Sequence, residues 1–145
     1  MCSIPIRREV PNTCPYCNNE QVLKGYNTIP DIYPELCDYW SSKNLVKTDE
    51  VTRSVEAENK IFTWICDCCN LEFQERLGIV LEAFTKNNSS KLNSICPYCN
   101  KKLPKPNETV NYVKPYLINE WAKELNGDID TFFYDSNVLV DWICR

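Results

Sequence analysis

The spacing of the cysteines constrains this chain more than any other feature. The pentapeptide CPYCN occurs at residues 14–18 and again at 96–100, and Cys66 and Cys69 form a third pair with the same two-residue spacing. This spacing lets both thiolates of a pair face one metal ion, and two pairs complete a four-cysteine site. Because the chain has ten cysteines and no histidine, we expect any zinc site to consist of cysteines, with a carboxylate ligand as the exception.

The lack of histidine also excludes whole classes of function. Cys2His2 fingers, histidine-based catalytic triads, HNH-type nucleases and histidine-containing zinc deaminases all require this residue. Four thiolates around one divalent ion are typical of closed structural sites, whereas a catalytic zinc ion usually keeps one position open for water. The sequence therefore predicts a non-catalytic protein whose fold is stabilised by Zn²⁺.

The remaining composition indicates a cytoplasmic protein. The N-terminal sequence has no apolar segment of the kind found in secretory signals, and no segment reaches the roughly 18 apolar residues of a membrane span. In a reducing cytosol, paired C-x2-C motifs are more often zinc sites than disulfides. A length of 145 residues with 43% hydrophobic residues suits one ordinary domain or two small ones.

Hydrophobic periodicity predicts a small α+β fold made of short β-hairpins and short helices. The predicted elements are an irregular segment at residues 1–30, helices at 34–42 and 115–125, a strand at 61–66, a return strand from Leu71 that leads into a helix reaching Phe84, and a last strand at 138–143.

Comparison of the chain with itself reveals an internal repeat. The two CPYCN copies are 82 residues apart, a Pro-x-Leu motif followed by tryptophan recurs after 81 residues, and Trp-Ile-Cys recurs after 78 residues. Three groups in the same order at a nearly constant offset indicate a duplication. One complete module would span residues 14–100, and a partial second module would comprise residues 1–17 together with 101–145.

These motifs resemble the "probable zinc-ribbon domain" family, whose tandem copies occur in bacterial and viral proteins. The resemblance covers residues 14–100 and, as a truncated copy, residues 115–144. It implies zinc-ribbon or treble-clef-like modules, often in proteins of mobile elements, restriction-like endonucleases or DNA-binding proteins, and it identifies no activity for the module. Many members carry histidine where Cys69 stands. The matching positions are Cys14 to Cys17, Gly25, Asn27, Pro34 to Leu36, Trp40, Ser54, Trp64, Cys66, Phe73 and Cys96 to Cys99.

The first predicted metal site has the ligands Cys66, Cys69, Cys96 and Cys99. Its two pairs are separated by 26 residues that hold the predicted return strand and helix. Cys68 could replace Cys69, although a C-x-C pair is a tighter and less common chelate. We expect one Zn²⁺ ion here.

The second predicted site contains Cys14 and Cys17. Its third ligand is Cys144, the repeat counterpart of Cys66, and its fourth is Cys2. Cys37 and Cys68 are then assigned to neither site. A second Zn²⁺ ion would then be held by the two termini of one chain. Closure between two chains, or within a longer array of modules, is the alternative, so both a monomer and a dimer stay open.

Five lysines around the second CPYC copy are candidates for phosphate contacts. Nucleic-acid binding in a bacterial, phage or defence context is the first functional hypothesis, although the net charge of −4 argues against a nonspecific electrostatic binder. An adaptor or inhibitor that binds another protein through an acidic surface is the alternative. The lysines are Lys86, Lys91, Lys101, Lys102 and Lys105.

Two weaker patterns have competing interpretations. Asp49, Glu58 and Lys60 imitate the carboxylates and E-x-K element of magnesium-dependent restriction-like nucleases, but the pattern is short and lies where a solvated entry to the strand is expected, which is the favoured interpretation. The four tryptophans could stack on bases, but their positions at the repeat anchors favour core packing.

Overall fold

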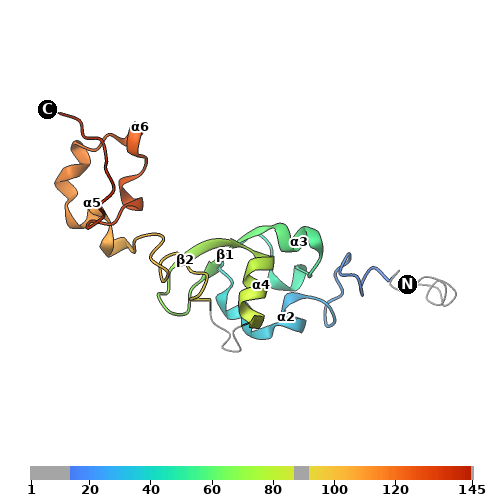
Figure 1. The fold of residues 1–145 in the computed structure, drawn as a ribbon. Helices are drawn as coiled ribbons and strands as arrows, with labels where there is room; N and C mark the ends of the chain where they lie inside the picture. Colours follow the sequence, from blue (N-terminus) through green and yellow to red (C-terminus); the bar gives the residue numbers. More distant parts are fainter. Residues whose placement is uncertain (1–13, 87–91, 145) are drawn as a thin grey trace. The chain divides into compact units, whose positions relative to one another are not determined.

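The computed structural model describes residues 14–86 and 92–144, and the chain divides between residues 95 and 96 into two compact units. The first unit contains a two-stranded antiparallel sheet and short helices, and the described part of the second unit contains short helices only (Figure 1). The chain is therefore a small α+β protein, as the sequence predicts. The proposed division into a module at 14–100 and a split second module stays a prediction.

The β-hairpin is the centre of the first unit. Strand β1 (Ile61–Ile65) pairs with strand β2 (Glu72–Arg76), and Trp64 lies opposite Phe73. Burial alternates along both strands, and neither Trp64 nor Phe73 is more than 5% exposed. Because this alternation has the period of a strand, the predicted strand and return strand are confirmed.

Helix α4 (Leu77–Lys86) follows β2 directly and buries one face, formed by Leu77, Val80 and Leu81. These residues have the i, i+3, i+4 spacing that places side chains on one side of a helix, as predicted. The backbone of α4 also approaches α3 (Val55–Asn59) closely. A side-chain carbon at Gly78 would lie 3.2 Å from the backbone oxygen of Glu58, so glycine permits this contact.

Helix α2 (Ile29–Ile32) forms where the sequence was expected to be irregular. That expectation was wrong because Pro30 lies in the first turn of the helix, where proline is tolerated. The carboxylate of Asp31 caps this turn by accepting hydrogen bonds from the backbone N–H and the hydroxyl of Thr28. The predicted helix at 34–42 is instead a 3-10 helix that ends at Tyr39.

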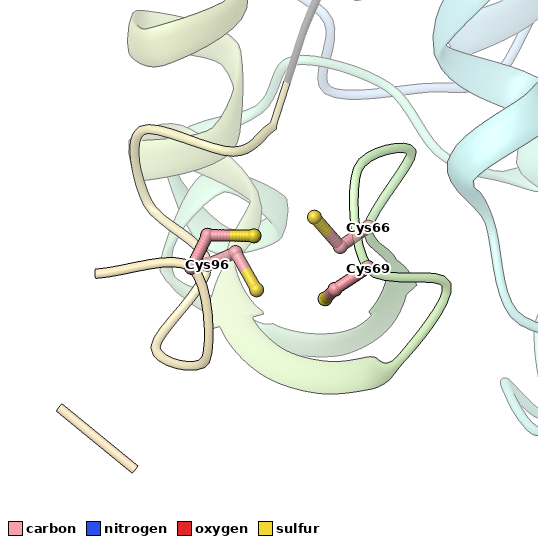
Figure 2. A group of neighbouring side chains, drawn as sticks. Cys66, Cys69 and Cys96 are labelled. Carbon is pink, nitrogen blue, oxygen red and sulfur yellow. The ribbon is translucent and has the colours of Figure 1, made fainter. Parts of the chain in front are cut away.

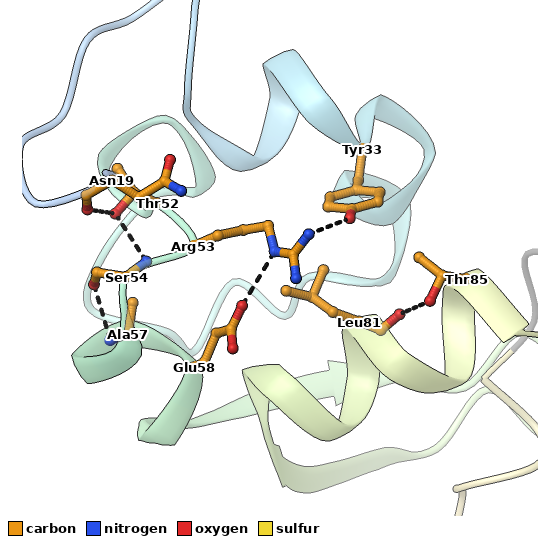
Figure 3. Close-up of polar contacts among 9 residues, drawn as sticks. All are labelled: Asn19, Tyr33, Thr52, Arg53, Ser54, Ala57, Glu58, Leu81 and Thr85. Atoms are coloured by element: carbon orange, nitrogen blue, oxygen red, sulfur yellow. Dashed lines mark hydrogen bonds and ion pairs between the residues drawn. The ribbon is translucent and has the colours of Figure 1, made fainter. Parts of the chain in front are cut away.

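Arg53 joins α2 to α3. Its guanidinium group forms an ion pair with Glu58 at 3.1 Å and donates to the hydroxyl of Tyr33 at 3.0 Å (Figure 3). Next to it, the hydroxyl of Ser54 accepts a hydrogen bond from the backbone N–H of Ala57 and caps α3. Glu58 therefore belongs to a helix, whereas the sequence suggested a strand entry.

The second unit contains helices α5 (Val110–Val113) and α6 (Lys123–Asn126). A single helix over 115–125 was predicted, but the structure has a 3-10 helix at Pro115–Asn119 and then α6. The two are separate because Trp121 forms an isolated β-bridge with Trp142. This bridge is all that the described residues show of the strand predicted at 138–143.

Several contacts of the first unit recur in the second. In both units an asparagine side chain forms two hydrogen bonds with the backbone of the residue before the second tryptophan of a pair. Asn44 bonds Thr63 at 2.8 Å, and Asn126 bonds Asp141 at 2.7 and 2.8 Å. The two units are thus built on the same local scaffold.

The paired tryptophans recur with nearly the same geometry. In the first unit Trp40 and Trp64 form a β-bridge, and their rings are 5.1 Å apart at 88°. In the second unit Trp121 and Trp142 do the same at 5.5 Å and 81°. Trp64 and Trp121 are buried, which favours the core-packing interpretation for both.

Candidate metal centre

The first cysteine pair is positioned by the turn of the β-hairpin. Strand β1 ends just before Cys66, and the N–H of Cys66 donates to the carbonyl of Leu71 at 3.0 Å. The N–H of Asn70 returns to the carbonyl of Cys66 at 2.8 Å, and Asn70 has a φ of 60°. Asparagine tolerates this left-handed conformation, so the chain can reverse directly after Cys69.

The second pair lies in the turn that starts at Cys96. The N–H of Asn100 donates to the carbonyl of Cys96 at 3.1 Å, and Lys101 adopts a φ of 54°. Upstream, Leu92 is fully buried, and its N–H donates to the carboxylate of Asp67 at 3.3 Å. Asp67 lies between the ligands of the first pair, so this hydrogen bond holds the incoming chain near the hairpin turn.

The two turns bring four thiol groups together, and Figure 2 shows Cys66, Cys69 and Cys96 pointing toward a shared space. The sulfur atoms of these residues and of Cys99 all lie within 4.8 Å of one another. Cys66 and Cys96 are buried, while Cys69 and Cys99 are half-buried. Within residues 14–86 and 92–144, this is the one cluster of three or more metal-ligating side chains.

The cluster fits a tetrahedral ion of the size of Zn²⁺. A zinc–sulfur distance of about 2.3 Å requires sulfur atoms about 3.8 Å apart, so the sulfurs would need to approach by no more than about 1 Å. The four predicted ligands of the first site therefore form a group that could hold a metal ion, and Cys68 lies outside it and is exposed.

The second predicted site is only partly described. Cys2 lies outside the described residues, and Cys144 is exposed. Cys14 is half-buried and Cys17 is exposed. The joining of these four cysteines stays a prediction.

The turn that carries Cys14 and Cys17 nevertheless has the same conformation as the turn at Cys96. Four backbone hydrogen bonds of one turn recur in the other, and each turn contains one residue with a positive φ, Asn19 or Lys101. The turn at Cys14 and Cys17 thus has the backbone conformation of the turn that carries Cys96 and Cys99. The four bonds run from Asn18 to Cys14, Asn19 to Tyr16, Glu20 to Pro15 and Gln21 to Pro15, matched by Asn100 to Cys96, Lys101 to Tyr98, Lys102 to Pro97 and Leu103 to Pro97.

The predicted phosphate-binding lysines differ in their surroundings. Lys86 forms an ion pair with Glu82 one helical turn away, and Lys91 lies outside the described residues. Lys101 and Lys102 are exposed next to the Cys96–Cys99 turn, and Lys105 is half-buried.

The residues of the nuclease-like pattern take part in three separate ion pairs. Asp49 contacts Lys24 at 2.7 Å, Glu58 contacts Arg53, and Lys60 contacts Glu56 at 2.9 Å. The hydrogen bond from Lys24 holds the pKa of Asp49 below its usual value. The charged groups of this pattern are therefore each paired with a different neighbour.

Comparisons of the chain with protein-family models, with curated proteins and with solved structures gave no match. Among the described residues, no helix is long and apolar enough to cross a lipid bilayer.

Proposed function

We propose that this chain is a non-catalytic zinc protein in which Cys66, Cys69, Cys96 and Cys99 hold one Zn²⁺ ion. The convergence of four thiol groups within 4.8 Å carries this proposal. A bound zinc ion would cross-link the hairpin turn to the turn at Cys96. The resemblance to the "probable zinc-ribbon domain" family points to the same role.

Loss of structure on metal removal tests the zinc proposal. Cysteine side chains bind zinc only as deprotonated thiolates, and the binding free energy of structural zinc is also folding free energy. A strong chelator should therefore reduce the circular dichroism signal of the protein, and added Zn²⁺ should restore it. An unchanged spectrum in chelator would contradict the proposal.

We further propose that the surface beside the metal centre binds nucleic acid in a mobile-element, phage or defence setting. Lys101 and Lys102 are exposed and follow Cys99 after one intervening residue, and Lys105 lies further along. A turn held by a metal ion would present these ammonium groups to successive phosphates with little loss of backbone entropy on binding.

The salt dependence of binding tests this proposal. Fluorescent single- and double-stranded DNA and RNA oligomers should bind at low salt, and affinity should fall as salt rises, with a slope of about 0.7 to 0.9 per phosphate contact. The double variant Lys101→Glu and Lys102→Glu should bind more weakly with a smaller slope. Lys123→Glu, an exposed lysine on α6, is the matched control and should bind as the parent does. No binding to any oligomer at low salt would refute the proposal.

A second candidate function is binding to another protein, as an adaptor or inhibitor. The acidic balance of the chain, 20 acidic against 16 basic residues, favours it. Large exposed hydrophobic side chains in the second unit favour it more specifically, and they include Tyr116, Leu125, Val138, Leu139 and Trp142.

A further inference from the structure

The apolar positions that form the core of the first unit have counterparts in the second unit that are not covered. Five of these positions are less than 10% exposed in the first unit, and their five counterparts are all half-buried or exposed. Trp64 is fully buried, for example, whereas Trp142 is 47% exposed. The pairs are Ile29 with Val110, Leu36 with Leu117, Val51 with Phe132, Phe62 with Val140 and Trp64 with Trp142.

In the first unit, strand β2 lies against Trp64, and helix α4 adds a buried apolar face. Phe73 on β2 lies opposite Trp64, and the indole N–H of Trp64 donates to the carbonyl of Glu75 on the same strand. Helix α4 then contributes a buried face that starts at Leu77. No strand or helix among described residues 96–144 takes the place of these two elements.

The uncovered positions of the second unit form a single surface. All five counterparts line one groove with a volume of about 130 Å³. Val138 also lines the groove, whereas its neighbour Leu139 does not and is 98% exposed. The groove is therefore the site that a covering segment would occupy.

An unpaired backbone edge at the isolated β-bridge between Trp121 and Trp142 runs along the same groove. The carbonyl of Asp141 accepts a hydrogen bond from the N–H of Ala122, and the N–H of Ile143 donates to the carbonyl of Glu120. These bonds join residues 141–143 to the segment that contains Trp121. Backbone groups of successive residues in a strand point in opposite directions, so those of Val140 and Trp142 face the other way. No described residue bonds them.

We propose that this groove and the backbone edge at Trp142 bind a segment of a separate protein that consists of an extended strand followed by a short amphipathic helix. The strand would pair antiparallel with Val138–Ile143 and place an aromatic side chain opposite Trp142, as Phe73 lies opposite Trp64. The helix would insert leucine and valine side chains, as α4 does. This inference rests on the proposed binding to another protein, and it assigns to that function a site and a class of partner.

Neither β2 and α4 of a second copy nor residues 1–13 supply a fitting segment. In a second copy of the chain, β2 and α4 are already paired and buried, with Leu77 and Val80 fully buried. Residues 1–13 contain no aromatic residue and no leucine. A strand of another protein added to an exposed sheet edge is a common mode of peptide recognition.

A synthetic peptide with the sequence of residues 70–86 is the probe. It carries β2 and α4, and it should bind the full-length, zinc-loaded protein with one-to-one stoichiometry in calorimetry. Val138→Asp, which places a charge in the groove at an exposed position, should weaken binding at least about tenfold. Leu139→Asp is the matched control and should leave the affinity unchanged, and the peptide variant Phe73→Ala should bind more weakly.

Each other result would overturn the inference. No binding of the peptide would remove the site, and equal loss in the Val138→Asp and Leu139→Asp variants would place the binding elsewhere. Concentration-dependent dimerisation that only Val138→Asp abolishes would make a second copy the occupant. Binding of a different protein elsewhere on the chain would leave the second proposed function intact while this inference failed.

Discussion

The two units share a local scaffold but differ in what covers it. Both contain a tryptophan pair at 5.1 or 5.5 Å and an asparagine that bonds the strand backbone. Only the first unit has a hairpin and a following helix among its described residues. The short-range contacts of residues 96–144 therefore form without the strand and helix that bury the matching residues in the first unit.

The difference has an energetic consequence. Full burial of a large apolar side chain contributes about 1.5 to 3 kcal/mol relative to exposure. Trp64 is fully buried and Trp142 is 47% exposed, and four other pairs of positions differ in the same direction. We therefore expect the second unit to open at a lower free energy than the first.

The largest expected difference in stability is between the loss of a cysteine in the four-cysteine cluster and the loss of a cysteine outside it. Structural zinc contributes an apparent free energy of about 10 to 16 kcal/mol in zinc-finger peptides, comparable with the whole stability of a domain. Cys96→Ser should therefore unfold the first unit, whereas Cys37→Ser should have little effect. Urea unfolding of the two variants measures this. If their unfolding curves coincide, the four-cysteine cluster does not stabilise the fold.

The next effect compares the second tryptophan of each pair. Trp64→Ala removes a fully buried side chain and should cost about 3 to 5 kcal/mol. Trp142→Ala removes a half-exposed one and should cost markedly less in the absence of a partner. Hydrogen exchange resolved along the chain assigns each loss to its own unit. Equal losses would mean that the groove of the second unit is covered in solution.

The next prediction compares the hydrogen bonds of Asn44 in the first unit with those of Asn126 in the second, which have similar geometry. Asn44→Ala leaves a half-buried backbone position without its partner and should cost about 1 to 3 kcal/mol. Asn126→Ala breaks the matching bonds, but these are solvent-exposed, so water replaces them and the loss should be smaller. Thermal unfolding of the two variants compares them, and a larger loss for Asn126→Ala would contradict the view that the second unit is less covered.

The smallest effect concerns Glu72 on β2. Hydrogen bonds from Lys43 and then from Ser41 hold the pKa of Glu72 below its usual value of 4.5. The ionised carboxylate therefore stabilises the first unit above about pH 4.5, and this contribution is lost as the pH falls through the lowered pKa. Ser41→Ala should raise the pKa of Glu72 in an NMR titration and slightly reduce stability at neutral pH.

The counterpart of Ser41 in the second unit is Ala122, which provides the control. No described residue of the second unit takes the place of Glu72, so Ala122→Ser should leave stability unchanged. A shift of the Glu72 pKa in the Ala122→Ser variant would show that the titration does not report on the hydrogen bond from Ser41.

The sequence predicted the hairpin, the helix after it and the group of cysteines that meets at its turn. These features depend on strong local signals: alternating apolar residues before Cys66, helical spacing from Leu77 to Leu81, and fixed two-residue cysteine spacing. Each signal lies within about ten residues, where side-chain periodicity determines the element.

The short helices were harder to predict from the sequence. Helix α2 has four residues and begins with a capping threonine, which is a real signal that the nearby proline obscured. The break at Trp121 depends on pairing with Trp142, a long-range contact that outweighs the helical periodicity of residues 115–125. Asp67 was missed as a positioning residue, because its hydrogen bond to Leu92 joins segments 25 residues apart.

The zinc content of the intact chain, measured by native mass spectrometry, tests the central claim most directly. We expect the parent protein to carry one ion at Cys66, Cys69, Cys96 and Cys99, the Cys96→Ser variant to lose it, and the Cys14→Ser variant to retain it. A second ion that is lost in Cys14→Ser would support the second predicted site, and the mass of the species would show whether one chain or two close it. A parent protein without zinc, or a Cys96→Ser variant that keeps every ion, would contradict the account.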